Sequence, residues 1–169
     1  MSKSKRSGYK SQTLQAGELF ERAFKEWKRK KLRLALRLFV AAAEAGDKGA
    51  QVNAGYFYDK GIGVRPNRSK AFYWYKRAYR RGDSGAANNI ATMWRDQQKM
   101  RLALIWFEKA VKLGDDGSNL EIAKYYLRRQ HDPKKAISYL DKVCRSNRVA
   151  EVELEEANRL LREAQRMLT

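Results

Sequence analysis

The stretch that decides the fold is AQVNAGYFYDKGIGVRPNRSKAFYWYKRAYRRG, which covers residues 50–82. Small residues such as Ala50 and Gly55 lie at helical spacing, and a Gly-x-Gly turn follows at Gly61 and Gly63. A second helical pattern then runs to Gly82. The stretch therefore predicts a helix, a turn, a second helix and a stop, and the rest of the chain contains diverged copies of this unit.

The second helical pattern occurs four times, beginning at Ala35, Ala71, Ala103 and Ala136. Each copy has a small residue, a bulky pair three and four positions later, and a small or β-branched residue at the seventh position, all on one helix face. The bulky pairs are Leu38/Phe39, Trp74/Tyr75, Trp106/Phe107 and Tyr139/Leu140. Three copies end at Gly46, Gly82 and Gly114, where glycine provides the left-handed residue that ends a helix.

The segments between these copies repeat as well, from Ala50, Ala86 and Ser118 to an aromatic residue eight positions later. Small residues on such a face allow two helix axes to approach closely. Residues 14–27 form another amphipathic pattern, and residues 149–168 have the polar outer face that a terminal capping helix needs. The sequence thus predicts four helix pairs, each with an A helix and a B helix, followed by a cap.

The second unit resembles a Sel1-like repeat, a tetratricopeptide-related helix pair. It departs from the family pattern at Ala54, Asn67 and Tyr79, and the third and fourth units lack the Gly-x-Gly turn. The residues that match the family pattern are Ala50, Gly55, Tyr58, Gly61, Gly63, Val64, Ala71, Trp74, Tyr75, Ala78 and Gly82.

The resemblance implies an all-α, right-handed α-solenoid in which the A helices line a concave groove. The expected organisation is a disordered basic tail at residues 1–12, four repeats, and a C-terminal capping helix at 147–169. The repeats are expected at 13–48, 49–82, 83–114 and 115–146. Small proteins of this family often act as adaptors or regulators, and some bacterial members are immunity proteins that neutralise a toxin.

The charge of the chain is large and uneven. There are 37 Lys and Arg residues against 19 Asp and Glu residues, a net charge of +18, and residues 1–82 hold 21 of the basic and 6 of the acidic residues. Such an imbalance predicts an acidic protein partner or a nucleic acid. The longest apolar run, residues 38–43, is too short to span a bilayer, so a cytoplasmic protein without a membrane partner is expected. The Ser/Lys-rich, acid-free first 17 residues leave a transit peptide as an alternative.

Candidates for chemistry are few. Cys144 is the sole cysteine and His131 the sole histidine, so an internal disulfide and a zinc site built on several cysteines are excluded. No Ser/His/Asp or Cys/His constellation can be assembled beyond these single residues. We interpret Cys144 as a core thiol and His131 as a surface turn residue. Gly61 and Gly63 lack the third glycine and the preceding strand of a phosphate loop. We therefore expect no catalytic residue, cofactor, metal or small-molecule substrate.

Two sets of residues are candidates for binding. Polar or aromatic A-helix residues off the apolar stripe suit a protein or peptide surface. They are Gln51, Asn53, Tyr56, Asn88, Asn89, Thr92, Lys124, Tyr125 and Arg128. The predicted basic patch comprises two clusters that are expected to be neighbours in the stack. The first is Lys28, Arg29, Lys30, Lys31, Arg33 and Arg37, and the second is Arg65, Arg68, Lys70, Arg77, Arg80 and Arg81.

The sequence therefore favours a non-catalytic interaction module for an acidic protein partner, an adaptor or regulator such as an immunity protein. A nucleic-acid-binding helical-repeat protein is the alternative, and the strong positive charge is what supports it.

Overall fold

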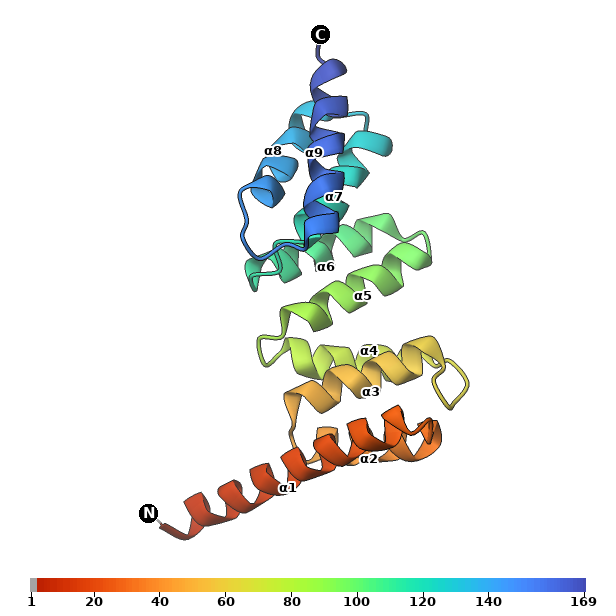
Figure 1. Cartoon of the computed structure of the whole chain (residues 1–169), viewed down its shortest axis with the longest axis vertical. Helices are drawn as coiled ribbons and strands as arrows, with labels where there is room; N and C mark the ends of the chain where they lie inside the picture. The colour runs from red at the N-terminus through yellow and green to blue at the C-terminus, as the bar shows by residue number, and fades with distance from the viewer. Residues whose placement is uncertain (1–2) are drawn as a thin grey trace. The chain divides into compact units, whose positions relative to one another are not determined.

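A computed structural model of the chain describes the backbone of residues 3–169 and the side chains from residue 14 onward. The described residues form nine helices and no strand (Figure 1). They are α1 (Lys3–Lys28), α2 (Leu32–Glu44), α3 (Lys48–Lys60), α4 (Arg68–Tyr79), α5 (Ser84–Asp96), α6 (Met100–Lys112), α7 (Ser118–Arg128), α8 (Pro133–Cys144) and α9 (Glu151–Arg166). None of these helices combines the length and apolar composition needed to cross a bilayer.

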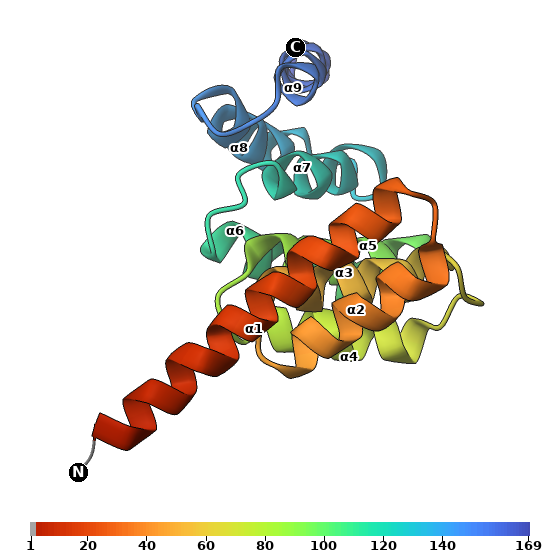
Figure 2. The same cartoon turned by 60° about the horizontal axis from the view of Figure 1, so that its bottom comes forward.

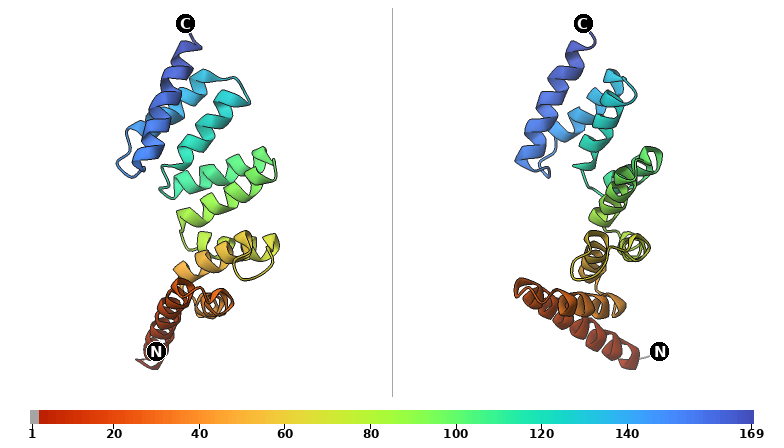
Figure 3. Two further views of the ribbon diagram at one scale, coloured as in Figure 1. Left: turned by 45° about the vertical axis from the view of Figure 1, so that its right-hand side comes forward. Right: turned by 90° about the vertical axis from the view of Figure 1, so that its right-hand side faces the viewer.

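The chain divides into two compact units, unit 1 (Met1–Ala86) and unit 2 (Ala87–Thr169). In unit 1, α2 packs against both α1 and α3, and α3 packs against α4; α1 and α2 lie side by side in Figures 1 and 2. In unit 2, α7 packs against α6 and α8, and α9 covers α8 (Figure 3). The order of A and B helices predicted from the sequence is confirmed.

The joints between one B helix and the next A helix follow one plan. Gly46, Gly82 and Gly114 have positive φ angles of 98°, 79° and 93°, as the sequence predicts for helix ends. At the first joint, the amide of the next residue, Asp47, donates to the Ala42 carbonyl. The Asp47 carboxylate then accepts a hydrogen bond from the Ala50 amide and begins α3. Two adjacent residues thus end one helix and start the next.

The core of unit 1 is a cluster of aromatic rings around Phe39 of α2, which is fully buried. Its ring centroid lies 5.2 Å from that of Phe24 on α1 and 5.3 Å from that of Phe57 on α3, in edge-to-face geometry. Trp27 of α1 contacts Phe57 as well, at 5.1 Å. Phe39 therefore joins three helices.

The core of unit 2 between α7, α8 and α9 is aliphatic. Leu120 and Leu127 of α7 pack with Leu140 of α8 and Leu160 of α9, all nearly inaccessible to solvent. Tyr126 and Tyr139 stack at 5.7 Å along the same α7–α8 contact. The predicted stripe is confirmed in both units, because the small residues at the four B-helix starts are buried, as are both members of two bulky pairs and one member of each of the other two.

The N-terminal segment differs from the expectation. Helix α1 begins at Lys3, whereas a disordered tail was expected at residues 1–12. No proline interrupts residues 3–13, so the helical backbone can continue toward the N-terminus from the packed segment. Residues 1 and 2 lie outside the described residues.

Gly55 offers a direct test of the helix packing. A Cβ atom at Gly55 would lie 2.6 Å from the Tyr75 ring, whereas a Cβ at Gly17 of α1 would meet nothing within 4 Å. We expect Gly55→Ala to destabilise the protein by about 1–3 kcal/mol through overpacking. Gly17→Ala is the matched control and should stabilise it by about 0.5–1 kcal/mol, because alanine is the better helix former. Urea denaturation measures both, and equal effects would contradict the close α3–α4 contact.

Candidate partner-binding surface

Basic residues gather where α1 turns into α2 and where the loop between α3 and α4 meets them. The sequence Lys28–Lys31 forms the turn, and Arg33 and Arg37 follow on exposed positions of α2. Gly63, with φ at 69°, packs so closely that a Cβ there would lie 2.8 Å from the Cβ of Leu32. This contact brings the loop that carries Arg65 to the start of α2. We call the residues Lys28, Arg29, Lys30, Lys31, Arg33, Arg37, Arg65 and Arg68 the turn cluster.

The remaining residues of the predicted basic patch lie elsewhere. Arg68 begins α4 and Arg80 follows its last residue, so a helix of roughly 18 Å separates them. Arg81 donates a hydrogen bond to the Gly46 carbonyl at the far end of α2. Arg77 lies over the rings of Tyr73 and Trp74, at 5.7 and 5.2 Å. The second predicted cluster, residues 65–81, therefore spans both ends of α4, which carry separate groups of cations.

The positive charge of the turn cluster is largely uncompensated. Arg29 and Lys31 pair with Glu26 of α1, at 3.1 and 3.8 Å, and Glu26 is itself buried. No other residue of the cluster forms an ion pair with a described residue. Several unpaired cations on one exposed edge raise the local potential and attract an acidic partner.

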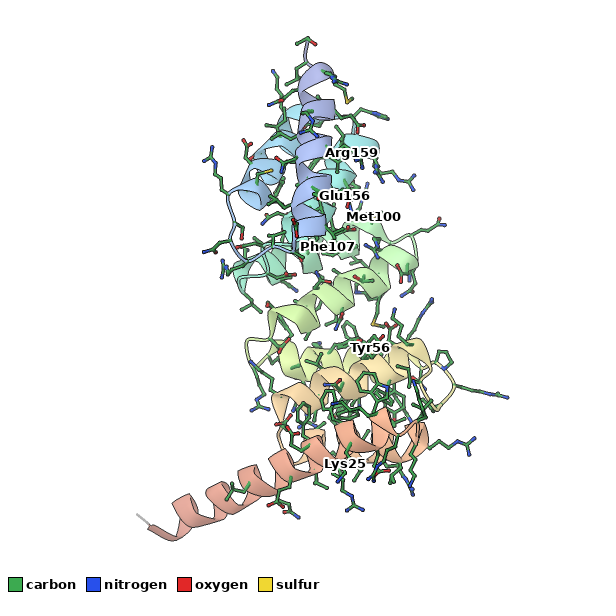
Figure 4. All side chains as sticks on the ribbon, in the orientation of Figure 1. Lys25, Tyr56, Met100, Phe107, Glu156 and Arg159 are labelled. Carbon is green, nitrogen blue, oxygen red and sulfur yellow. The ribbon has the colours of Figure 1, made fainter. Side chains whose placement is uncertain are left out.

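The A-helix candidates of unit 1 are partly used inside the protein. Gln51 is only 1% exposed, and its side-chain amide donates to the Ala43 carbonyl, so its expected place off the core is wrong. The short α2–α3 connection brings this position under α2. Asn53 bonds to the Gly49 carbonyl of its own helix. Tyr56, which is labelled in Figure 4, is 37% exposed, and it is the most exposed of these three residues.

Asn88 in unit 2 is structural. Its side-chain amide donates to the Asp115 carboxylate at 2.8 Å and to the Ser118 hydroxyl at 3.0 Å, so it fixes α5 against the start of α7. Asn89 and Thr92 are half-buried on the same helix. The neighbouring Asp116 has structural partners as well, since it accepts hydrogen bonds from Ser146 and Arg148.

Lys124 lies in an ion-pair network that connects three helices. Arg95 of α5 pairs with Glu121 of α7 at 2.5 Å, and Lys124 pairs with Glu121 at 3.0 Å and with Glu156 of α9 at 2.8 Å. Glu156 and Arg159 are labelled on α9 in Figure 4. Burial tends to raise the pKa of Glu121, but hydrogen bonds from Lys124 and Arg95 outweigh it and hold this pKa below its ordinary value. The Lys124 ammonium is thus engaged within the protein.

The last two A-helix candidates lie at the end of α7. Tyr125 is half-buried, and its hydroxyl accepts a hydrogen bond from the Gln130 side chain at 2.9 Å. Arg128 is exposed and pairs with no described acidic residue. Beside them, Lys99, Arg101 and Arg129 line a shallow depression with Tyr125.

The single cysteine and histidine have no catalytic geometry. Cys144 is half-buried instead of fully buried, because it lies at the last position of α8, and its thiol contacts the Asn158 side chain at 3.5 Å. Burial raises the pKa of this thiol, which disfavours the reactive thiolate. His131 is an exposed turn residue. No group of three or more metal-ligating side chains occurs within the part of the chain that the structure describes.

Sequence reasoning missed a feature of the turns inside the repeats. Lys30, Gln98 and His131 all have positive φ angles, of 61°, 60° and 49°, and each lies two residues before a B helix. An alignment of the repeats by their B helices would have placed these residues in one column. The i,i+3 spacing of Glu121 and Lys124 was likewise a visible sign of an ion pair.

Comparison with known proteins agrees with this architecture. The Sel1 repeat family model matches residues 28–47, 49–83, 95–115 and 118–147, which is more than half of the chain. A Sel1 repeat protein from Oxalobacter formigenes has a similar structure, with 26% sequence identity and a TM-score of 0.62. That match covers 77% of this chain and 52% of the other, so this chain spans about half the length of that relative.

Two further structures share features of the fold. One is the protein c5321, described as a protective antigen present in uropathogenic Escherichia coli strains. The match covers 66% of this chain and 25% of the c5321 chain, at 24% sequence identity and a TM-score of 0.58. The match with the immunity protein Pa5087 from Pseudomonas aeruginosa covers 89% of this chain and 82% of that protein's chain, at 16% sequence identity. Its TM-score is 0.39, so the two backbones differ too much for this likeness to bear on function.

The Glu121 network makes the stability of unit 2 depend on pH. A carboxyl whose pKa is lowered by folding stabilises the folded state above its unfolded pKa, and this contribution is lost as the pH falls through the folded pKa. We expect Glu121→Gln to lower stability at neutral pH and to flatten the acid-side decline. The exposed Glu155 provides the control Glu155→Gln. Urea denaturation at neutral and acidic pH measures this, and parallel pH profiles for wild type and Glu121→Gln would refute it.

Proposed function

Because this chain belongs to the Sel1 repeat family, whose repeats form protein-interaction scaffolds, we propose that it binds an acidic protein partner and has no catalysis of its own. The observation that carries the acidity of the partner is the turn cluster, where only Arg29 and Lys31 have an ionic partner among the described residues. A toxin neutralised by an immunity protein is one partner of this kind expected from the family.

The distribution of ion pairs supports unit 1 as the charged binding surface. In unit 2, cations such as Arg95, Lys124 and Arg148 pair with acids on other elements and thereby hold the unit together. In unit 1 only two cations of the turn cluster, Arg29 and Lys31, pair with a described acid, the buried Glu26. Exposed unpaired cations add little to folding stability but accelerate the encounter with an acidic protein.

A-helix residues of each unit, taken separately, supply further, less charged contacts. Tyr56, Asn89, Thr92, Tyr125 and Arg128 keep at least part of their side chains open to solvent. Aromatic and amide groups of this kind contribute contact area and hydrogen bonds at protein interfaces. We propose that they contact the partner after charge attraction has brought it to the surface.

Nucleic-acid binding is the second candidate function, because Arg77 lies over two aromatic rings and Tyr73 is 52% exposed beside it. Exposed aromatic rings next to cations can stack on bases. Binding of this type loses affinity steeply between about 50 and about 200 mM salt. This second function would be favoured if RNA co-purifies with the protein, nuclease treatment removes that RNA, and no protein partner is recovered.

Charge reversal tests the proposed function. We expect Lys28→Glu/Arg33→Glu/Arg37→Glu to slow association with the native partner about tenfold or more at low salt, because long-range attraction is lost. The triple variant Arg145→Glu/Arg162→Glu/Arg166→Glu, which changes the exposed cations of unit 2 by the same charge, is the control. Affinity purification with mass spectrometry identifies the partner, and stopped-flow kinetics measures association. Equal rates for the two variants would contradict the assignment to unit 1.

A further inference from the structure

The start of α2 lines a shallow, open depression, and we call its half-buried leucines the floor and its exposed cations the rim. Lys30, Lys31, Arg33 and Arg37 line it together with two leucines and Gly63 of the α3–α4 loop. The leucines, Leu32 and Leu34, are half-buried, so apolar surface lies between the cations. An apolar floor with a basic rim is a combination that neither the charge pattern nor the family resemblance predicts.

Gly63 gives this depression a fixed wall. Its φ of 69° is in the left-handed region, and a Cβ atom there would come within 2.9 Å of the Leu32 carbonyl carbon and 3.0 Å of the Arg33 nitrogen. The backbone of the loop therefore lies directly against the backbone at the start of α2. The wall is positioned by packing between two turns and does not depend on a flexible side chain.

Lys30 occupies a backbone conformation that glycine would adopt at lower cost. Its φ is 61°, and the turn is held by hydrogen bonds from the Lys30 amide to the Trp27 carbonyl and from the Lys31 amide to the Glu26 carbonyl. The left-handed region is unfavourable for residues with a Cβ atom. A lysine at this position places a cation on the rim of the depression despite the conformational cost.

Of the four cations that line the depression, only Lys31 has an acidic partner within the described part of the chain, namely Glu26. Lys30, Arg33 and Arg37 form no ion pair with a described residue, and the first turn of α2 contains no acidic side chain. Arginine guanidinium groups can bind carboxylates through two parallel hydrogen bonds. The cations of the rim therefore suit carboxylates, and the leucines of the floor suit an aliphatic side chain.

We propose that this depression receives an acidic segment of the protein partner, in which one apolar side chain flanked by Asp or Glu residues lies over Leu32 and Leu34. The proposal rests on the proposed function and assigns the point of contact within unit 1. Carboxylates of the segment pair with Lys30, Arg33 and Arg37, and the apolar side chain removes the two leucines from water.

Synthetic peptides test this with the full-length protein. The first probe is a fluorescently labelled Glu-Glu-Asp-Leu-Asp-Glu-Glu peptide, the second replaces its Leu by Ser, and the third replaces its acids by Gln and Asn. Fluorescence anisotropy at about 50 mM salt is expected to show the first peptide binding several-fold tighter than the second and about tenfold or more tighter than the third. Equal affinity for the Leu and Ser peptides would overturn the apolar floor, and equal affinity for the acidic and neutral peptides would overturn the basic rim.

Protein variants locate the peptide. Arg33→Glu/Arg37→Glu should weaken the first peptide about tenfold or more, whereas Arg162→Glu/Arg166→Glu on α9 changes the charge equally and should leave it nearly unchanged. Lys30→Gly should weaken binding while keeping or raising the melting temperature, which separates loss of contact from loss of folding. Equal weakening by the two double variants would overturn the depression as the site.

The outcomes also separate this proposal from the proposed function. If the native partner still requires the cations of the turn cluster but the first peptide binds no better than the neutral one, the depression is not the contact and the interaction module stands. If no protein partner is recovered and a single-stranded RNA displaces the first peptide from the same site, both assignments fail.

Discussion

The ring of Tyr75 lies so close to Gly55 that no side chain larger than hydrogen fits between α3 and α4. This close approach is the constraint on which the repeat depends, because a helix pair that packs through small residues leaves its bulky residues free to reach the next helix. Phe39 makes use of that freedom in unit 1, where its ring contacts residues of α1 and α3. The identities of the small residues thus set the spacing, and the rings fill the space that remains.

The two units use charge in different ways. In unit 2, Glu121 accepts from Arg95 and Lys124, and Lys124 also reaches Glu156, so cations and carboxylates from three helices stabilise one another. In unit 1, the buried Glu26 forms ion pairs with only two cations of the turn cluster, Arg29 and Lys31. Like charges held together without partners oppose folding slightly and favour binding of an anion. The fold therefore holds a charged surface in place that its own residues do not neutralise.

Packing between the α3–α4 loop and the start of α2 places these cations around one depression. Gly63 seats the α3–α4 loop on the start of α2, and the left-handed Lys30 turns the chain so that its side chain joins Arg33 and Arg37 on one rim. Several A-helix residues that suit a binding surface by type have structural roles instead. Gln51 bonds to the Ala43 carbonyl and Asn88 to Asp115, because each lies where two helices meet and a buried amide needs a partner.

The sequence by itself determined the order of the helix pairs and the apolar stripe of each helix, but not the start of α1 or the burial of Gln51. Small and bulky residues at helical spacing predict a buried stripe on each helix. Glycines such as Gly46 and Gly63 mark positions where the backbone has a positive φ angle, and at Gly63 a close contact also leaves no room for a side chain. It also determined the excess of positive charge. Only the tertiary structure decided which polar residues face solvent, that the basic patch divides between the two ends of α4, and that Leu32 and Leu34 lie among the cations. Helical periodicity fixes the face of a single helix, but the neighbours of that face depend on contacts between residues far apart in the chain.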